Sequence, residues 1–204
     1  MKQIAIIGAG GHTRSSINLV KQYFSAQPLQ IFDDSYDSSK TEIIHNVNLI
    51  GRIEEIPENH QIFLSLGNNS ERERLFQKYN CQIIKTNLFH ARSFQESDLT
   101  IGQSNQIFAS TYLNSYVRIG DNNIINTSAI LEHEVEIGNH NHVSVGATLC
   151  GRVKIGNRCF IGAGAVIIDK VSICDDVIVG AGAVVIQDIK ECGTYVGNPA
   201  RKVK

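Results

Sequence analysis

The 204-residue sequence contains no tryptophan, one methionine and three prolines, and its formal net charge is only −1. It has no long basic run, which argues against nucleic acid as the main partner. Its apolar runs are much shorter than a membrane span, and glycines interrupt the first of them too early for a good signal peptide. We therefore expect a soluble, cytoplasmic protein that binds neither membranes nor nucleic acid.

Closely spaced cysteine pairs are also lacking. The five cysteines show no CxxC spacing and are odd in number; they are Cys81, Cys150, Cys159, Cys174 and Cys192. Without a secretory signal, this pattern indicates reduced thiols rather than a disulfide framework. The hydrophobic content of 42% and charged content of 19% are ordinary for a globular protein.

A repeat of six residues governs the second half of the chain. Fifteen consecutive positions at this step are aliphatic, namely Ile101, Ile107, Leu113, Ile119, Ile125, Leu131, Ile137, Val143, Leu149, Ile155, Ile161, Ile167, Ile173, Val179 and Val185. A step of six would scatter these side chains around an α-helix, whereas extended segments can keep them on one side. The repeat therefore predicts a parallel β-helix.

Two further positions of the repeat support this prediction. Glycine often follows the aliphatic residue, as at Gly102, Gly120, Gly138, Gly156, Gly162 and Gly180. Small or β-branched residues often stand four places after it, as at Thr111, Ala129, Val135, Ala147 and Ala165. We expect the glycines to form turns and the small residues to fill tight interior corners.

The first 86 residues have a different pattern, in which short apolar segments alternate with helical ones. We expect strands at 3–7, 29–34, 61–69 and 81–86, and helices at 13–24 and 71–78. This alternation predicts a small parallel α/β domain. We therefore divide the chain into an α/β domain at 1–86 and a β-helix domain at 87–204.

Suggestive residues follow three of these strands. They are Gly8, Gly10, Gly11 and His12; Asp33 and Asp34; and Gly67, Asn68 and Asn69. Ligands bind at the carboxyl ends of strands in such sheets, and the two aspartates could accept hydrogen bonds from a ribose or a base. The dinucleotide fingerprint is incomplete because Thr13 takes its third glycine position. A tight turn without a ligand is the alternative.

The stretch LEHEVEIGNHNHVSVG (131–146) holds three histidines and three glutamates. Its aliphatic frame places neither His133 nor His142 at a core position. Eighteen residues make one coil of three hexads, so His133 stacks about 4.8 Å from Gly151 in the next coil. A base beside a backbone N–H could perform acyl transfer, with the N–H binding the oxyanion. A zinc site and a plain polar surface are the alternatives.

The chain resembles bacterial sugar acetyltransferases of the PglD/NeuD type, which are hexapeptide-repeat enzymes. The similar motifs are GAGGH (8–12), FDD (32–34), GNN (67–69), NTSAILEHEVEIG (126–138), HVSVGA (142–147), VKIGNRCFIGAGAVI (153–167) and GNPAR (197–201). The resemblance implies that the β-helix is left-handed. Relatives often carry GHG or GHA where this chain has GHT at 11–13.

The resemblance also implies a role for each site residue. His133 is expected as general base, Glu134 as its orienting partner, and the Gly151 amide and His142 as groups facing the thioester. Ala163 and Ala181 are expected to contact the pantetheine arm of acetyl-CoA. Substrate-binding residues are expected at Gly10, Gly11, His12, Asp33, Asp34, Gly67 and Asn126.

We therefore expect a homotrimeric N-acetyltransferase that uses acetyl-CoA and no metal. Its expected acceptor is the 4-amino group of a nucleotide-linked, UDP-type 4-amino-4,6-dideoxy sugar for a bacterial surface glycan. Three alternatives stay open: an O-acetyltransferase for a sialic-acid-type sugar, a zinc hydratase of the γ-carbonic-anhydrase kind, and a silent sugar-nucleotide-binding protein.

Overall fold

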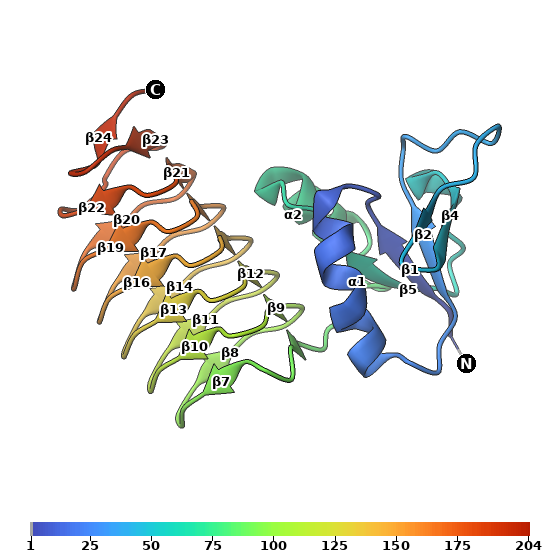
Figure 1. Ribbon diagram of the computed structural model, residues 1–204, viewed down its shortest axis with the longest axis horizontal. Helices are drawn as coiled ribbons and strands as arrows, with labels where there is room; N and C mark the ends of the chain where they lie inside the picture. The colour runs from blue at the N-terminus through green and yellow to red at the C-terminus, as the bar shows by residue number, and fades with distance from the viewer. Residues whose placement is uncertain (1) are drawn as a thin grey trace. The chain divides into compact units, whose positions relative to one another are not determined.

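The computed structural model describes residues 2–204. The chain forms two compact units, and the boundary between them along the sequence falls between Lys85 and Thr86. The first unit is an α/β domain and the second is a β-solenoid (Figure 1). No helix within residues 2–204 is both long and apolar enough to cross a membrane.

The α/β unit contains a five-stranded sheet in the order β3-β4-β2-β1-β5. The strands are β1 (Ile4–Ile7), β2 (Leu29–Phe32), β3 (Ile43–Ile44), β4 (Val47–Gly51) and β5 (Gln61–Leu64); the helices are α1 (Gly11–Tyr23), α2 (Asn69–Lys78) and the 3-10 helix η1 (Ile53–Glu55). All pairings are parallel except that of β3 with β4. The carboxyl ends of β2, β1 and β5 therefore meet at one edge, as we predicted.

Two local predictions for this unit need correction. The segment 81–86 forms no strand, because only one isolated bridge joins Ile83 to Ile62. In addition, a hairpin that the periodicity did not reveal, β3–β4, extends the sheet beyond β2. Its two turn residues, His45 and Asn46, both have positive φ angles of 48° and 64°, as a tight two-residue hairpin requires.

The solenoid confirms the repeat of six. Each hexad contributes a strand of only two or three residues, and strands eighteen residues apart pair in parallel along three faces. Face 1 contains β6 (Leu88–Phe89), β9 (Gln106–Ile107), β12 (Ile124–Ile125), β15 (His142–Val143), β18 (Phe160–Ile161), β21 (Val177–Val179), β23 (Gly193–Val196) and β24 (Arg201–Lys202).

Faces 2 and 3 continue the same coils. Face 2 contains β7 (Phe94–Gln95), β10 (Tyr112–Leu113), β13 (Ile130–Leu131), β16 (Thr148–Leu149), β19 (Val166–Ile167) and β22 (Val184–Val185). Face 3 contains β8 (Thr100–Ile101), β11 (Arg118–Ile119), β14 (Glu136–Ile137), β17 (Lys154–Ile155) and β20 (Ser172–Ile173). The three corners between them are named corner 1–2, corner 2–3 and corner 3–1.

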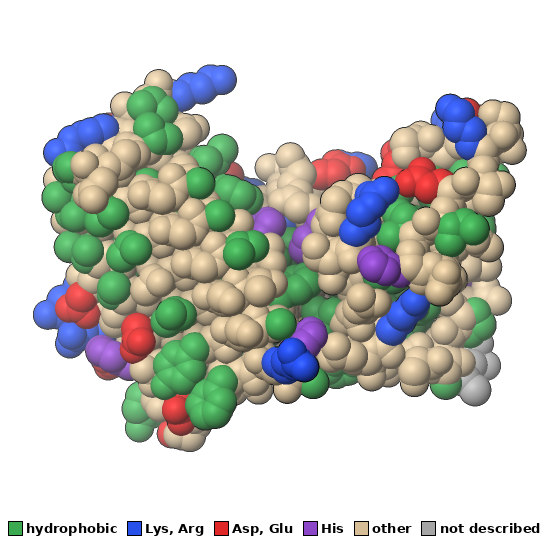
Figure 2. Space-filling model, viewed as in Figure 1, with side chains coloured by type: hydrophobic (Ala, Val, Ile, Leu, Met, Phe, Trp, Pro, Cys, Tyr) green, Lys and Arg blue, Asp and Glu red, His purple; other side chains and the backbone are tan. Residues whose placement is uncertain are grey.

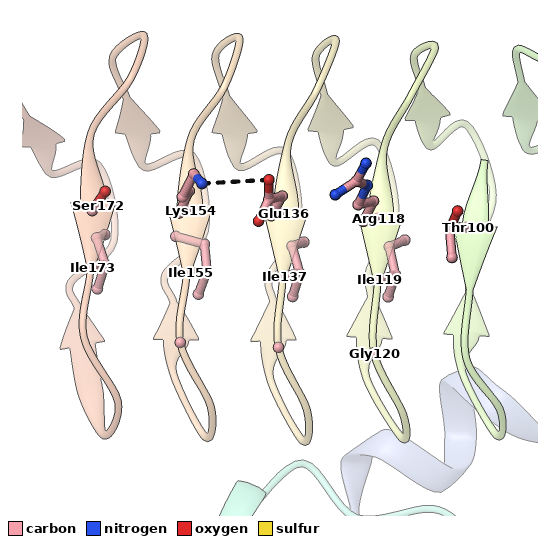
Figure 3. Close-up of a pocket in the computed structure, with 12 residues that line it drawn as sticks. Thr100, Arg118, Ile119, Gly120, Glu136, Ile137, Lys154, Ile155, Ser172 and Ile173 are labelled. Atoms are coloured by element: carbon pink, nitrogen blue, oxygen red, sulfur yellow. Dashed lines mark ion pairs between the residues drawn. The ribbon is translucent and has the colours of Figure 1, made fainter. Parts of the chain in front are cut away.

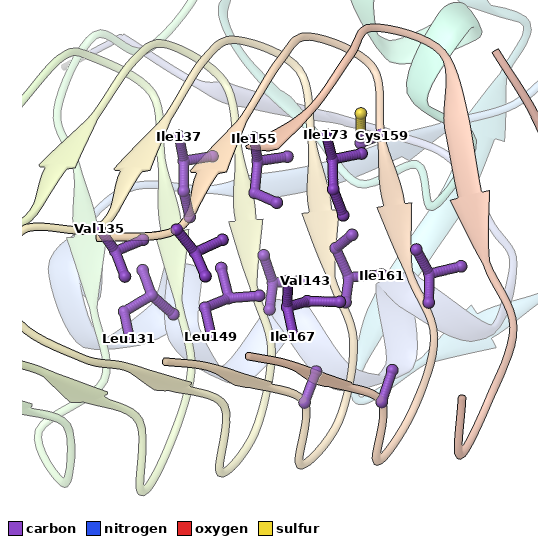
Figure 4. Close-up of a cluster of buried hydrophobic side chains, with 14 of the residues drawn as sticks. Leu131, Val135, Ile137, Val143, Leu149, Ile155, Cys159, Ile161, Ile167 and Ile173 are labelled. Carbon is purple, nitrogen blue, oxygen red and sulfur yellow. The ribbon is translucent and has the colours of Figure 1, made fainter. Parts of the chain in front are cut away.

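The aliphatic positions of the repeat form the core of the solenoid (Figure 4). From Ile107 to Val185 every one of them is buried, and so are the small residues four places on. Identical positions stack coil upon coil, so each side chain packs against the same kind of side chain above and below. This stacking explains why the pattern tolerates almost no exception.

The expected role of the glycines after the aliphatic residues was wrong. The left-handed conformation falls instead on the third residue of each corner, from Asp98 to Gly182 at every sixth position. The glycines are needed for close packing between coils: a Cβ on Gly120 would lie 2.7 Å from the Gly138 carbonyl oxygen. Absence of a side chain, rather than a special φ angle, is what those positions require.

A column of buried asparagines lines corner 3–1. Asn123 accepts a hydrogen bond from the Asn141 N–H at 2.7 Å and donates to the Gly138 carbonyl at 2.9 Å. Asn105 and Asn141 make equivalent bonds one coil away, and the column ends at Cys159. These bonds satisfy polar backbone atoms that the corner buries, and burial raises the pKa of the Cys159 thiol to about 12.

Candidate active site

His133 lies at corner 2–3, directly over Gly151 of the next coil. A Cβ added to Gly151 would lie 2.6 Å from both Cε1 and Nε2 of the imidazole. The neighbouring Glu134 carboxylate lies 3.2 Å from His133 Nδ1. Because a carboxylate accepts hydrogen bonds, this contact places the proton of neutral His133 on Nδ1 and leaves Nε2 free as a base, facing the glycine.

Gly151 also offers a hydrogen-bond donor at this position. Within residues 2–204 its N–H donates to no protein acceptor, although the residue is buried. The Cys150 carbonyl, in the same peptide group as this N–H, accepts from the Val153 N–H at 3.4 Å, and the Gly151 carbonyl accepts from the Lys170 N–H at 2.9 Å, so the backbone is held on both sides of Gly151. A free backbone donor on the residue that packs against an imidazole can bind an oxyanion next to a general base.

Charged residues that the sequence reasoning missed surround this pair. Asp169 lies in the coil above, 3.0 Å from the ideal Cβ position of Gly151, and accepts a hydrogen bond from Arg152 at 3.1 Å. The spacing 133, 151, 169 could have revealed it, since all three share one column. Arg152 offsets the Asp169 charge, which would otherwise oppose a developing oxyanion beside Gly151.

His142 lies on face 1, next to corner 1–2. It is the first residue of β15, is buried, and lies with its Nε2 3.1 Å from the Asn126 side-chain nitrogen. Its ring stacks edge-on against Phe160 with centroids 5.1 Å apart. Asn126 also accepts from the Thr127 N–H at 2.8 Å, so both side chains are held in place at corner 1–2.

Ala163 and Ala181 lie at the same corner as Asn126. Each precedes a left-handed glycine, Gly164 and Gly182, whose missing side chains leave open space around the backbone. Within residues 2–204 the N–H groups of both alanines donate to no protein acceptor. This edge therefore exposes unpaired backbone donors in two successive coils.

The predicted site residues of the solenoid consequently fall into two groups. His133, Glu134 and Gly151 lie at corner 2–3, whereas Asn126, Ala163 and Ala181 lie at corner 1–2, next to His142 of face 1. Face 2 separates the two corners, since each coil passes from corner 1–2 through a face 2 strand to corner 2–3. One chain does not bring all of these residues together.

The carboxyl edge of the α/β sheet holds the remaining predicted residues. Gly10 is the N-cap of α1 without a side-chain cap, and a Cβ on Gly10 or Gly11 would meet no atom within 4 Å. His12 is the second residue of α1. The open first turn of a helix without acidic side chains is suited to an anion such as phosphate.

Asp33 lies beside this turn. Its Oδ2 accepts from the Ala9 N–H at 2.8 Å, and its Oδ1 accepts from the N–H and hydroxyl of Ser35. Partial burial acts to raise the pKa of Asp33, but the bonds from Ser35 and Ala9 outweigh it and hold the pKa below its ordinary value. The carboxylate is thus charged and fixed.

The departure from the dinucleotide fingerprint has a structural reason. Thr13 is fully buried and donates its hydroxyl to the Gly8 carbonyl at 2.7 Å. Gly8 has a φ of +112°, and a Cβ there would lie 2.7 Å from the Ser65 carbonyl. The Thr13 side chain therefore stabilises the turn through a buried hydrogen bond, whereas a glycine at this position would have no side chain to make it.

Asp34 and Gly67 lie farther along the same edge. Asp34 accepts from the Ile53 N–H at 3.3 Å and so holds η1, while Gly67 lies in the turn between β5 and α2. Asn68 caps α2 by accepting from the Glu71 N–H at 2.9 Å. Asp34 and Asn68 therefore have structural partners.

The three histidines of the 131–146 stretch do not converge. His133 lies at corner 2–3, His142 lies on face 1, and His140 lies at corner 3–1 with its Nδ1 2.9 Å from the Asn122 side-chain nitrogen. Among residues 2–204 no group of three or more histidines, cysteines or acids is placed to hold a metal ion. This arrangement gives the zinc hydratase hypothesis no structural support.

Comparisons with known proteins agree with this architecture. Residues 3–79 match the family model described as the PglD N-terminal domain, and residues 152–187 match the bacterial transferase hexapeptide model of six repeats. The chain combines a PglD N-terminal domain with hexapeptide-transferase repeats. No curated protein matches the sequence.

Several solved structures are similar over the full chain. The acetyltransferase domain of PglB from Neisseria gonorrhoeae is 26% identical with a TM-score of 0.90, and the similarity covers 100% of both chains. PerB from Caulobacter crescentus, in complex with CoA and GDP-perosamine, is 27% identical with a TM-score of 0.89, covering 100% of this chain and 98% of that one. WeeI from Acinetobacter baumannii, 24% identical with a TM-score of 0.82 over 100% of both chains, shares the fold.

Proposed function

We propose that the protein is an acetyl-CoA-dependent N-acetyltransferase acting on a nucleotide-linked 4-amino-4,6-dideoxy sugar, with UDP and GDP as the first nucleotides to test. The observation that carries this proposal is the His133 imidazole packed against the bare Cα of Gly151, a residue whose N–H has no protein acceptor within residues 2–204. Similar structures support it, because the PglB domain was solved with acetyl coenzyme A, and the Caulobacter N-acetyltransferase with CoA and GDP-perosamine.

The geometry supports a direct transfer. The neutral sugar amine attacks the thioester carbonyl carbon, and a C–N bond forms while His133 Nε2 takes the amine proton. The carbonyl oxygen becomes an oxyanion that the Gly151 N–H stabilises. When the tetrahedral intermediate collapses, the C–S bond breaks, and the imidazolium can return its proton to the departing CoA thiolate. Glu134 keeps Nε2 available throughout, because it accepts from Nδ1.

Corner 1–2 supports an extended pantetheine arm. Its left-handed positions are all small, namely Ser110, Ser128, Gly146, Gly164 and Gly182. The free N–H groups of Ala163 and Ala181 can bond to the amide carbonyls of the arm. Beyond the last coil, the Gly197 carbonyl accepts from the Val184 N–H at 3.0 Å, which attaches the C-terminal segment to face 2. This segment continues into β24, which contains Arg201 and Lys202, and the C-terminal end of the chain is basic (Figure 2). These cations suit the CoA phosphates.

The surfaces of the solenoid support a trimer. The outward column of face 2 is largely apolar and consists of Phe94, Tyr112, Ile130, Thr148, Val166 and Val184. The outward column of face 3 is polar and charged, with Glu136 and Lys154 paired at 3.4 Å (Figure 3). Face 2 is therefore the better candidate for burial against other copies.

A threefold arrangement with face 2 turned toward the axis would also complete the site. Each prism would then place its corner 1–2 beside corner 2–3 of the next copy, in a closed ring of identical contacts. His133 and Gly151 of one chain would meet His142, Ala163 and Ala181 of its neighbour. The separation of the two residue groups within one chain is thereby explained.

We predict a mass of three chains in solution and loss of activity when face 2 is charged. Ile130→Glu would place a carboxylate in the middle of the apolar column, and we expect it to shift sedimentation toward the monomer and abolish acetyl transfer. Glu136→Lys on face 3 is the matched control and should remain a trimer. An Ile130→Glu monomer with full activity would contradict the shared site.

We also predict that the α/β unit selects the sugar nucleotide. Asp33→Ala removes the fixed carboxylate beside the α1 N-terminus and should raise the KM for the sugar nucleotide about tenfold or more, the effect of losing a charge-assisted hydrogen bond. The KM for acetyl-CoA should change less than twofold. Initial rates of CoA release, measured against each substrate in turn, test this. An equal rise in both KM values would argue against the division.

N- and O-acetylation need the same base, so the assay should include both acceptors. Purified protein with acetyl-CoA is offered UDP- and GDP-linked 4-amino sugars and, separately, a free sialic acid. Acetylation of the amino sugar supports the proposal, whereas acetylation of sialic acid alone supports the O-acetyltransferase. The assay is repeated after exhaustive chelation, and we expect undiminished turnover.

A further inference from the structure

A pocket of about 460 Å³ lies at the same edge of the α/β sheet, two strands away from α1. It is lined by Tyr36, Asp37, Ser38, Arg52 and Glu55. Arg52 directly follows β4, whose last residue, Gly51, accepts from the Asp33 N–H at 3.0 Å. The pocket is therefore adjacent to Asp33 on the side away from the α1 N-terminus.

The order along this edge fits the order of groups in a nucleotide. The α1 N-terminus lies at the end of β1, Asp33 at the end of β2, and the pocket at the end of β4. Neighbouring strands are about 4.8 Å apart, so the pocket is about 10 Å from the α1 turn. That span suits a diphosphate at α1, a ribose at Asp33 and a base in the pocket.

Charge favours this orientation over the opposite one. Carboxylates of Asp37 and Glu55 line the pocket, and Asp34 holds the adjoining η1 helix. Asp37 is paired with Lys40 at 3.0 Å and Arg52 supplies one further cation, so the pocket has no excess of positive charge and suits a neutral base better than a diphosphate. The half-buried Tyr36 adds an aromatic ring on which a base can stack.

Two side chains of the pocket retain free hydrogen-bonding groups. Within residues 2–204, the Arg52 guanidinium makes no hydrogen bond or ion pair with the protein. Glu55 uses Oε2 to accept from the Arg52 N–H at 2.6 Å, and its Oε1 has no donor among the same residues. The pocket thus presents a fixed acceptor close to a cationic donor.

We propose that Arg52 and Glu55 read the nucleobase of the sugar nucleotide, and that they select a base with a carbonyl next to a ring N–H. Arg52 donates to the carbonyl oxygen and Glu55 accepts from the N–H. Guanine, uracil and thymine share this edge, whereas adenine and cytosine present an amino group and an unprotonated ring nitrogen there. The inference rests on the proposed function and names the substrate class of its nucleotide site.

Calorimetric titration of the full-length protein with UDP, dTDP, GDP, CDP and ADP tests the proposal. We expect at least one of the first three to bind ten times more tightly than CDP and ADP, which is the effect of one hydrogen bond to a charged group. Arg52→Ala should reduce this preference to less than threefold. Arg52→Lys keeps the positive charge but loses the planar guanidinium, and should retain part of the preference over CDP and ADP.

Lys78→Ala is the control, because it removes one positive charge from the far end of α2 in the same unit. It should keep the full preference, and thermal melting of every variant checks folding. Equal binding of all five diphosphates, or a preference that survives Arg52→Ala, overturns the base-reading pocket and leaves the acetyltransferase intact. Failure of every diphosphate to bind, together with no turnover of any sugar nucleotide, overturns the proposed function itself.

Discussion

His133→Ala should lower kcat by about 10²–10⁴-fold, the usual contribution of a positioned acid–base group. The variant loses the only imidazole over Gly151 within residues 2–204, so no group takes the proton as the amine attacks. The KM for acetyl-CoA should change little, because corner 1–2 holds the proposed pantetheine contacts. Steady-state rates of CoA release measure both effects.

Folding should survive this substitution. The His133 side chain is 47% exposed and lies outside the aliphatic core, so its removal leaves no buried cavity. Thermal melting of the variant should match the wild-type protein. Glu136→Ala, three residues along the same stretch but on face 3, is the control and should keep full activity. A normally folded His133→Ala protein that turns over at the wild-type rate would disprove the mechanism.

Neighbouring substitutions should have weaker and different effects. Glu134→Ala removes only the partner that orients Nδ1, so it should cost less than His133→Ala. His142→Ala should act mainly on acetyl-CoA, since the side chain lies next to corner 1–2, against Asn126. This contrast separates the base from the groups that bind its substrates.

The repeat made the solenoid predictable because the same physical requirement recurs every six residues. An aliphatic side chain that points inward must stack on another in the next coil, so register follows from sequence position alone. For the same reason the stacking of His133 on Gly151 could be inferred from a spacing of eighteen. The asparagine column carries the same signal at Asn87, Asn105, Asn123 and Asn141, and could have been found in the same way.

The α/β unit was less predictable because its short elements depend on tertiary contacts. The 81–86 segment is as apolar as a strand, yet it joins the sheet only through Ile62, whose N–H donates to the Gln82 carbonyl and whose carbonyl accepts from the Ile84 N–H. The β3–β4 hairpin depends on the backbone of His45 and Asn46, which apolar periodicity does not report. The proposed nucleobase pocket was not predicted from the sequence either, because its Arg52 lies directly after β4, a strand of this unpredicted hairpin.

The glycine at position 151 gives the second large effect that we expect. Gly151→Ala should lower kcat by about 10²-fold, because the new Cβ would lie 2.6 Å from His133 Nε2 and force the ring away from its position. A displacement of about 1 Å is enough for a loss of this size. Its φ is not positive, so alanine fits the backbone, and melting should change little.

A double variant tests whether the effect passes through His133. In the His133→Ala background the imidazole is absent, so the added methyl group meets no ring, and Gly151→Ala should cost less than about threefold in residual activity. Equal losses in both backgrounds would mean that the methyl group acts independently of the histidine, for example by obstructing the thioester or the Gly151 N–H. A smaller loss in the His133→Ala background would instead show that residue 151 must be glycine to leave room for the His133 imidazole.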